Sequence, residues 1–265
     1  MQKMAIRILA SDLDGTLLNE ESRISAKTAK AVKRAQKAGI RFIAVTGRAW
    51  NTAHPIFQEA EIKADYILLN GAEFRTSSGA IMYQETIEKN LAEKIVNYLS
   101  TTGIDFEVNT NKGDFSTDTK VCQTALEIQD FEKIWNQNPK ILKFFIFSDQ
   151  SIVIEKVKKY LKDWQGISVT SSAAWNVEIT AKAAEKGRML KRAAQFYQSS
   201  EDEVMVFGDG ENDETMFREF RHSRAVGNAV PVIRKIAEKV IESNRKNGVA
   251  KEIDQIIGGL QDGIF

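Results

Sequence analysis

The segment Ile8-Leu9-Ala10-Ser11-Asp12-Leu13-Asp14-Gly15-Thr16-Leu17-Leu18 indicates how the chain folds. An apolar run from Ala5 to Ala10 changes abruptly into two aspartates, a glycine and a threonine. A short apolar run that ends in a glycine turn and precedes a helical pattern is typical of a buried strand in a parallel sheet. Ligands of such sheets bind beyond the carboxyl ends of the strands, so Asp12 and Asp14 are expected at a binding edge.

The two aspartates favour a bound cation. In an extended chain their side chains lie roughly 7 Å apart on one face, and a glycine turn brings them closer. Two like charges at this distance repel each other unless a cation neutralises them. Carboxylate oxygens are hard ligands that suit Mg²⁺. The segment therefore predicts a magnesium site.

Three alternatives apply to this segment when it is taken alone. An EF-hand calcium loop starting at Asp12 requires glycine at its sixth position and glutamate at its twelfth, where this chain has Leu17 and Arg23. The aspartates could instead have a structural role and cap the next helix or turn. A receiver-type signalling domain also phosphorylates an aspartate at a strand end, but such a domain is small and needs no insertion.

Length and composition restrict the class of protein. The chain has 265 residues, which suits one large domain or two modest ones. Charged residues make up 28% and hydrophobic residues 43%, an ordinary composition for a soluble globular protein. The formal net charge of +1 creates no overall field that would attract nucleic acid or an anionic membrane. We expect neither as a partner.

Cysteine usage and the N-terminal sequence predict a cytoplasmic protein. The single cysteine, Cys122, excludes an internal disulfide framework and fits a reducing compartment. We expect it in a helix and partly buried. The first apolar run leads directly to Asp12, so it predicts a strand and not a signal peptide. No apolar segment reaches transmembrane length.

The pattern of a strand followed by a helix repeats after the first segment. Ser25–Ala38 predicts a helix with Ser25 as its N-cap. The next buried strand, Arg41–Val45, ends in Thr46-Gly47-Arg48, and a third strand, Tyr66–Leu69, ends in Asn70-Gly71. This alternation predicts an α/β fold with a Rossmann-like, doubly wound parallel sheet.

In the middle of the chain, hairpin-like pairs of strands mixed with helices replace the regular alternation of strand and helix. This pattern predicts an inserted α+β domain over residues 85–184. Residues 1–84 and 185–265 would then form the core. Within the insertion we expect helices over 87–99 and 154–164, a helical stretch between 117 and 141, and strands over 104–108, 114–117, 141–147, 168–171 and 175–179.

The core pattern resumes with a helix over 186–197. A fourth apolar strand over 203–207 ends in Gly208-Asp209-Gly210-Glu211-Asn212-Asp213. A short strand at 225–226, a helix from Pro231 and a closing helix over 249–260 complete the chain.

The polar groups at the strand ends form one set that suits a metal-bound phosphoryl group. Its members are Asp12, Asp14, Thr46, Gly47, Lys186, Asp209, Asn212 and Asp213. His54 and His222 are expected at the surface, outside this set.

Other nucleotide and metal motifs do not fit the segment from Gly208. A dinucleotide-binding motif needs glycine at Asp213, and a calcium loop from Asp209 fails at Glu214 and Phe220. The chain also has no P-loop motif.

Four motifs in order resemble those of the haloacid dehalogenase-like phosphatases. They are Asp12-Leu-Asp14-Gly-Thr16-Leu-Leu, Thr46-Gly-Arg48, Lys186-Gly187 and Gly208-Asp-Gly-Glu-Asn-Asp213. Asn70-Gly71, Gly227-Asn228-Ala229 and Asn247-Gly-Val249 further resemble the Cof-like subgroup, whose α/β cap is inserted between the second and third motifs. The chain departs from the family just before Lys186, where residues 181–185 lack a common proline.

The resemblance and the chemistry of the residues imply the same roles. Asp12 would attack phosphorus and form an aspartyl-phosphate, and Asp14 would act as general acid and then as general base. Mg²⁺ would be held by the Asp12 carboxylate, the Asp14 carbonyl and Asp209, with Asp213 supporting either the metal or Lys186.

Four further groups would hold the phosphoryl oxygens: Thr46, Gly47, Lys186 and Asn212. Arg48 is left outside the catalytic set, because it could contact phosphate or pair with surface acids. Trp175, Asn176 and Glu178 could contact substrate or belong to the core of the insertion.

The predicted function is a Mg²⁺-dependent phosphatase for small phosphorylated metabolites, which include sugar phosphates, flavin mononucleotide, pyridoxal phosphate and nucleotides. A phosphomutase of the same superfamily and a binding-only protein without turnover are the alternatives. The sequence selects no single substrate and carries no signal for oligomeric state.

Overall fold

The computed structural model describes residues 6–171 and 173–261, so Ala5, the start of the first apolar run, lies outside the described residues. Contacts between Cα atoms divide the chain into two compact units. The first consists of Met1–Tyr83 and Glu185–Phe265, and the second of Gln84–Ala184. The first boundary lies one residue before the position expected from the sequence.

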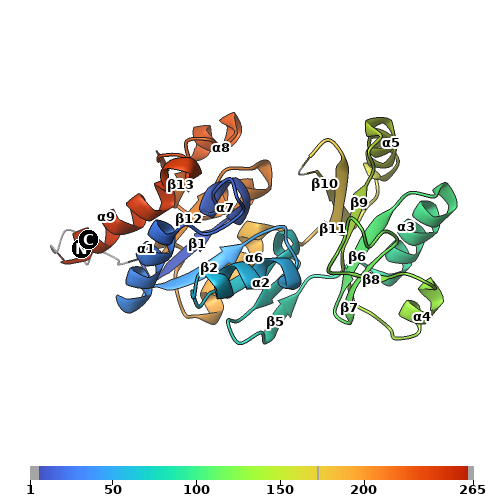
Figure 1. Ribbon diagram of the computed structural model, residues 1–265, viewed down its shortest axis with the longest axis horizontal. Helices are drawn as coiled ribbons and strands as arrows, with labels where there is room; N and C mark the ends of the chain where they lie inside the picture. The colour runs from blue at the N-terminus through green and yellow to red at the C-terminus, as the bar shows by residue number, and fades with distance from the viewer. Residues whose placement is uncertain (1–5, 172, 262–265) are drawn as a thin grey trace. The chain divides into compact units, whose positions relative to one another are not determined.

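The first unit contains the sheet that the opening segment predicts (Figure 1). Its strand order is β14-β13-β12-β1-β2-β3-β4-β5, parallel from β14 to β3, with β4 antiparallel to β3. The strands are β1 (Ile8–Ser11), β2 (Arg41–Val45), β3 (Asp65–Leu68), β4 (Glu73–Arg75), β5 (Ile81–Gln84), β12 (Val204–Gly208), β13 (His222–Ala225) and β14 (Lys239–Val240).

Helices of the first unit pack on this sheet and on one another. They are α1 (Ala26–Lys37), α2 (Trp50–Glu59), α6 (Lys186–Phe196), α7 (Glu214–Glu219), α8 (Pro231–Ile236) and α9 (Gly248–Gln261). The Ser25 hydroxyl caps α1 by accepting a hydrogen bond from the Thr28 amide at 3.1 Å. Helix α1 packs against α9, and α6 packs against α7. The predicted Rossmann-like α/β fold is confirmed.

Three adjacent parallel strands place the motifs at one edge. In the order β12-β1-β2, Ser11 lies beside Phe207 on one side and beside Ala44 on the other. The residues that follow these strands therefore leave the sheet at the same level. They include Asp12 after β1, Thr46 after β2 and Asp209 after β12.

The second unit is built on a six-stranded sheet in the order β10-β11-β9-β6-β7-β8, antiparallel except for the parallel pair β7–β8. Its strands are β6 (Phe106–Thr110), β7 (Gly113–Ser116), β8 (Leu126–Glu127), β9 (Ile141–Phe147), β10 (Ile167–Thr170) and β11 (Asn176–Ala181), and its helices are α3 (Lys89–Thr102), α4 (Phe131–Trp135) and α5 (Ser151–Leu161).

Several local predictions are wrong. The helical stretch expected between 117 and 141 consists of turns, the two-residue strand β8 and the five-residue helix α4. Cys122 accordingly lies in a turn, where it is buried. His54, expected at the surface, is partly exposed in α2 and stacks on Trp50 with 4.2 Å between the ring centroids.

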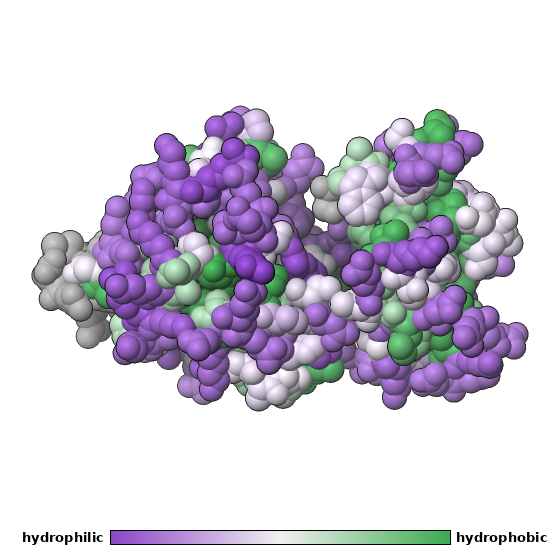
Figure 2. Space-filling view, in the orientation of Figure 1, coloured by the Kyte–Doolittle hydropathy of each residue, from purple (hydrophilic) through white to green (hydrophobic). Residues whose placement is uncertain are grey.

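No helix in the described part of the chain has the length and apolar character needed to cross a bilayer. Figure 2 shows hydrophilic side chains over most of the visible face of the first unit, with apolar side chains in smaller patches.

Candidate active site

Lys186 lies between two carboxylates. It is the first residue of α6, and its side chain is fully buried at 0% exposure. Its Nζ donates to Asp12 Oδ1 at 2.7 Å and to Asp213 Oδ1 at 2.6 Å. Gly187 allows α6 to approach this closely, because a Cβ at that position would lie 2.4 Å from the Thr215 backbone.

Three carboxylates gather around this lysine. The ligand atoms of Asp12, Asp209 and Asp213 all lie within 4.8 Å of one another. One ammonium faces three carboxylates, so the cluster carries excess negative charge when all of them are ionised. Hard oxygen donors at this spacing suit a divalent cation such as Mg²⁺.

Asp213 organises the loop that carries Asp209. Its Oδ2 accepts hydrogen bonds from the amides of Asp209 at 2.9 Å and Gly210 at 3.0 Å, while its Oδ1 holds Lys186. Gly208 leaves room for this arrangement, since a Cβ there would lie 2.6 Å from Asp213 Oδ2. Of the two roles predicted for Asp213, the structure shows the contact with Lys186.

The first motif also reaches Asp209. The Thr16 hydroxyl donates to Asp209 Oδ1 at 2.6 Å. Gly15 has a positive φ of 84°, and a Cβ on it would lie 2.4 Å from Asp209 Oδ2. The Asn228 amide donates to the Gly15 carbonyl at 2.7 Å. Thr16 and Asn228 had no assigned role, although both belong to motifs that the sequence analysis singled out.

The second and fourth motifs are joined through Asn70. The Asn212 amide donates to Asn70 Oδ1 at 3.2 Å, and the Asn70 backbone amide donates to the Thr46 carbonyl at 3.0 Å. Gly47 lies against the same side chain, because a Cβ there would be 2.9 Å from Asn70 Oδ1. The buried Thr46 hydroxyl accepts from the Arg48 amide at 3.1 Å.

Asp14 does not join the carboxylate cluster. Its carboxylate is 53% exposed and accepts two hydrogen bonds from Arg48, from Nε at 2.7 Å and from Nη2 at 2.5 Å. Arg48 was left outside the catalytic set by sequence reasoning. Its position directly after Thr46 and Gly47 is the signal that could have indicated this contact.

Burial dominates the electrostatics of the cluster. Burial raises the pKa of Asp12 well above its ordinary value, Lys186 opposes this rise, and Asp213 adds to it. Burial, together with Asp213, raises the pKa of Asp209 to about 6, although the bond from Thr16 lowers it. For Lys186 burial lowers the pKa, but the attraction of Asp12 and Asp213 prevails and the pKa rises. Ionising all three carboxylates costs free energy in this buried cluster, and a bound cation would lower that cost.

Other potential metal ligands lie elsewhere. His54 contacts Trp50 and Tyr66, and His222 lies 3.4 Å from Glu238. Cys122 belongs to the second unit. Among the described residues, the carboxylate cluster contains no softer ligand, which agrees with an oxygen-only cation site.

Comparison with known proteins identifies the class. The family model of haloacid dehalogenase-like hydrolases matches residues 9–253. The chain belongs to this family and is a phosphatase of its Cof-like subgroup.

Named relatives and solved structures agree with this assignment. Two of the relatives are from Bacillus subtilis (strain 168). The 5-amino-6-(5-phospho-D-ribitylamino)uracil phosphatase YwtE is 29% identical over 96% of this chain and 99% of its own length. Phosphatase YwpJ is 28% identical over 95% of this chain and 100% of its own length. A haloacid dehalogenase-like hydrolase structure from B. subtilis superimposes with a TM-score of 0.85 at 27% identity, covering 94% of this chain and 99% of that one.

Proposed function

We propose that the protein is a Mg²⁺-dependent phosphatase that hydrolyses small phosphorylated metabolites through an aspartyl-phosphate intermediate. The observation that carries the proposal is the position of Lys186, which bonds to both Asp12 and Asp213 beside Asp209. One cation and several carboxylates around a common point suit a phosphoryl group and a divalent metal ion.

Asp12 is the proposed nucleophile. Lys186 holds its Oδ1, so Oδ2 is the oxygen that attacks phosphorus. The new bond joins Oδ2 to phosphorus as the bond from phosphorus to the leaving oxygen breaks. Water then attacks the same phosphorus, which releases phosphate and restores the Asp12 carboxylate.

Asp14 is the proposed general acid and base. It protonates the leaving oxygen in the first step and takes a proton from water in the second, so one group serves both steps. Because Arg48 occupies both carboxylate oxygens of Asp14, this ion pair must open before Asp14 reaches the leaving oxygen.

The remaining groups bind the phosphoryl oxygens and the metal. We assign Thr46, Gly47, Lys186 and Asn212 to the phosphoryl group. Asp12, Asp209 and the Asp14 carbonyl would hold Mg²⁺, and Asp213 would act mainly through Lys186 and the loop amides. Bound Mg²⁺ would neutralise charge between the nucleophile and the phosphate dianion.

The insertion predicted over residues 85–184, which lies within the second unit, is the proposed specificity domain. All four motifs lie in the first unit, so the insertion contributes none of the catalytic set. In its sheet, Lys143 of β9 forms a buried ion pair with Glu178 of β11 at 2.7 Å. Trp175 is 49% exposed and packs edge-on against Phe145. We propose the exposed Trp175 as a residue that selects the substrate, whereas the buried Glu178 belongs to the core of the insertion.

The name of one relative suggests a first substrate to test. YwtE is named for a phosphoribitylamino-uracil compound, so this compound joins sugar phosphates, flavin mononucleotide, pyridoxal phosphate and nucleotides in the panel. The single cysteine supports the proposed cytoplasmic location.

The decisive experiment measures free phosphate released from this panel with Mg²⁺ and with a chelator. We expect release from at least one compound, its loss on chelation, and its loss in Asp12→Asn. Isomerised product without free phosphate would show a phosphomutase. Binding without either product would show a binding-only protein, and full activity of Asp12→Asn would exclude Asp12 as nucleophile.

A further inference from the structure

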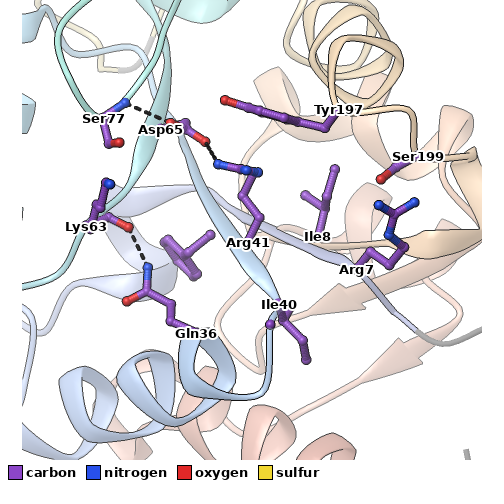
Figure 3. A pocket seen from close by; sticks show the side chains of 12 residues that line it. Arg7, Ile8, Gln36, Ile40, Arg41, Lys63, Asp65, Ser77, Tyr197 and Ser199 are labelled. Atoms are coloured by element: carbon purple, nitrogen blue, oxygen red, sulfur yellow. Dashed lines mark hydrogen bonds and ion pairs between the residues drawn. The ribbon is translucent and has the colours of Figure 1, made fainter.

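A polar hollow lies within the first unit, at the amino ends of three parallel strands (Figure 3). Its volume is about 290 Å³. Arg7 precedes β1, Arg41 begins β2, and Lys63 precedes β3. Tyr197, which follows α6, forms part of its wall.

Positive charge predominates in this hollow. Arg7, Arg41 and Lys63 line it, whereas Asp65 is the only carboxylate among its described lining residues. Asp65 is 2% exposed and already accepts from Arg41 Nη1 at 2.9 Å and from the Ser77 amide at 2.7 Å. Its charge is therefore turned toward the protein and not toward an incoming ligand.

Arg41 is held in position but keeps donors available. Its guanidinium stacks on the Tyr197 ring, with 3.6 Å from Cζ to the ring centroid, and one Nη is bonded to Asp65. Five N–H groups belong to a guanidinium, so most of its donors remain for a ligand. A planar guanidinium held in this way suits the oxygens of a phosphate group.

The other two basic side chains, Lys63 and Arg7, make few contacts with the rest of the protein. Lys63 is exposed, and its ammonium forms no ion pair with any residue that the structure describes. Arg7 donates to the Gln198 carbonyl at 3.0 Å and lies 3.7 Å from Glu203, a distance that suits a weak surface pair. The buried Ser199 adds a neutral hydroxyl to the lining.

This hollow is separate from the carboxylate cluster. Asp12 follows the carboxyl end of β1, whereas Arg7 precedes its amino end. A four-residue strand spans roughly 13 Å at about 3.3 Å per residue. The elements at the hollow nevertheless continue to the cluster, because β1 leads to Asp12 and α6 begins at Lys186.

We propose that this hollow is a second anion site, which binds the phosphate group of a small molecule independently of catalysis. The ligand is either inorganic phosphate or a phosphorylated metabolite. Arg41 would donate to the phosphate oxygens in a forked geometry, and Lys63 and Arg7 would complete the neutralisation of the dianion. The volume suits a small phosphorylated compound better than a large cofactor.

The test follows backbone amide resonances by NMR in a chelator, without Mg²⁺, at constant ionic strength. Inorganic phosphate and ribose 5-phosphate are titrated separately, with sodium chloride as the non-phosphate control. We expect saturable shifts of the Gly39, Arg41 and Ser77 amides. Saturation by both compounds identifies the phosphate group as sufficient, whereas saturation by ribose 5-phosphate alone shows that the sugar is also recognised.

Variants separate a specific site from general electrostatics. Lys63→Glu should weaken binding at these amides at least tenfold, and Lys63→Ala should weaken it severalfold. Lys37→Glu has the same charge change on an exposed residue outside the lining, and it should leave binding within twofold. Unchanged unfolding midpoints verify that the variants fold.

Three results would overturn the proposal. They are shifts confined to the amides near Asp12, Gly47 and Asp209, shifts near Arg41 that do not saturate, and equal weakening by Lys63→Glu and Lys37→Glu. The readout is binding without Mg²⁺, so the outcome does not depend on whether the protein hydrolyses any substrate in the panel.

Discussion

Asp14 and Arg48 form a two-point ion pair, in which both carboxylate oxygens accept from one guanidinium at 2.5 and 2.7 Å. The pair joins the first two motifs across 34 positions of sequence. Arg48, which had no assigned catalytic role, therefore holds the proposed general acid Asp14. Arg48 holds Asp14 in position and must release it before Asp14 can transfer a proton. Removing the Arg48 guanidinium should therefore affect proton transfer selectively.

Arg48→Leu should slow hydrolysis according to the leaving group. An alkyl phosphate such as ribose 5-phosphate needs a proton on its leaving oxygen, and we expect kcat to fall about 10- to 100-fold, within the range that general acid catalysis contributes. For p-nitrophenyl phosphate, whose leaving group needs no proton, we expect less than a threefold change. Arg218→Leu removes an exposed arginine and serves as control. Equal losses on both substrates would contradict a selective effect on proton transfer.

Lys186→Met should abolish activity and destabilise the fold. The substitution leaves Asp12 and Asp213 buried without their cation, which costs about 3 kcal/mol of unfolding free energy. Loss of the phosphoryl contact should reduce kcat by about a thousandfold. Lys191→Met on the same helix removes only surface ion pairs, so it should cost less than about 1 kcal/mol and leave kcat unchanged. Urea unfolding and steady-state kinetics measure both effects, and similar behaviour of the two variants would refute the assigned role.

Without metal, stability should fall as the pH rises from about 4 to 6. The pKa of Asp209 is 3.8 ordinarily and about 6 in the fold, so in this window the folded state binds more protons than the unfolded state. Since Asp209 is partly exposed, we expect a discounted change of about 1 to 2 kcal/mol. Asp209→Asn should flatten this slope.

Mg²⁺ should reverse the same dependence. The metal ion binds the carboxylate form, so the stabilisation by saturating Mg²⁺ should grow as the pH rises through about 6. Urea unfolding with and without Mg²⁺ at several pH values measures this. A Mg²⁺ effect of equal size in Asp209→Asn would argue against Asp209 as a ligand.

Gly15→Ala should both strain the backbone at residue 15 and displace the Asp209 carboxylate. A non-glycine residue at φ of 84° costs about 1 kcal/mol or more, and the added Cβ would lie 2.4 Å from Asp209 Oδ2. Gly39→Ala is matched in φ at 86° but has open space around the added Cβ. We therefore expect both variants to lose stability, and Gly15→Ala alone to weaken Mg²⁺ binding at least tenfold. Titration calorimetry with Mg²⁺ distinguishes them, and equal Mg²⁺ affinity would count against this packing.

The Cys122 thiol should be unreactive in the folded protein. Burial, together with a bond to Glu107, raises its pKa to about 12, and the thiolate is the reactive form. At pH 8 we expect its reaction with Ellman's reagent to be at least a hundredfold slower than in urea. Cys122→Ser sets the background, and a fast reaction in the native protein would show that the turn around Cys122 opens readily.

Sequence patterns predicted the core more completely than the insertion. The strands that carry the motifs are apolar runs with a glycine turn after each, and a local pattern of this kind is enough to predict a strand. The hairpin of β4 and β5 was not predicted, because its strands have only three and four residues and β5 is only partly buried. The helix expected around Cys122 failed for a related reason, because a mixed polar and apolar stretch does not distinguish turns from a helix.

Local sequence patterns were enough to predict which chemical groups stand at the strand ends and in what order along the chain. Their hydrogen-bond partners became known from the folded structure: Thr16 bonds to Asp209 across 193 positions, Asn212 to Asn70 across 142, and Lys186 to Asp12 across 174. The partner of Asp14 is Arg48, which sequence reasoning had left outside the catalytic set. The physical reason is that strand and turn signals are local properties of the backbone, whereas a hydrogen bond depends on how distant segments approach and which rotamers their packing permits.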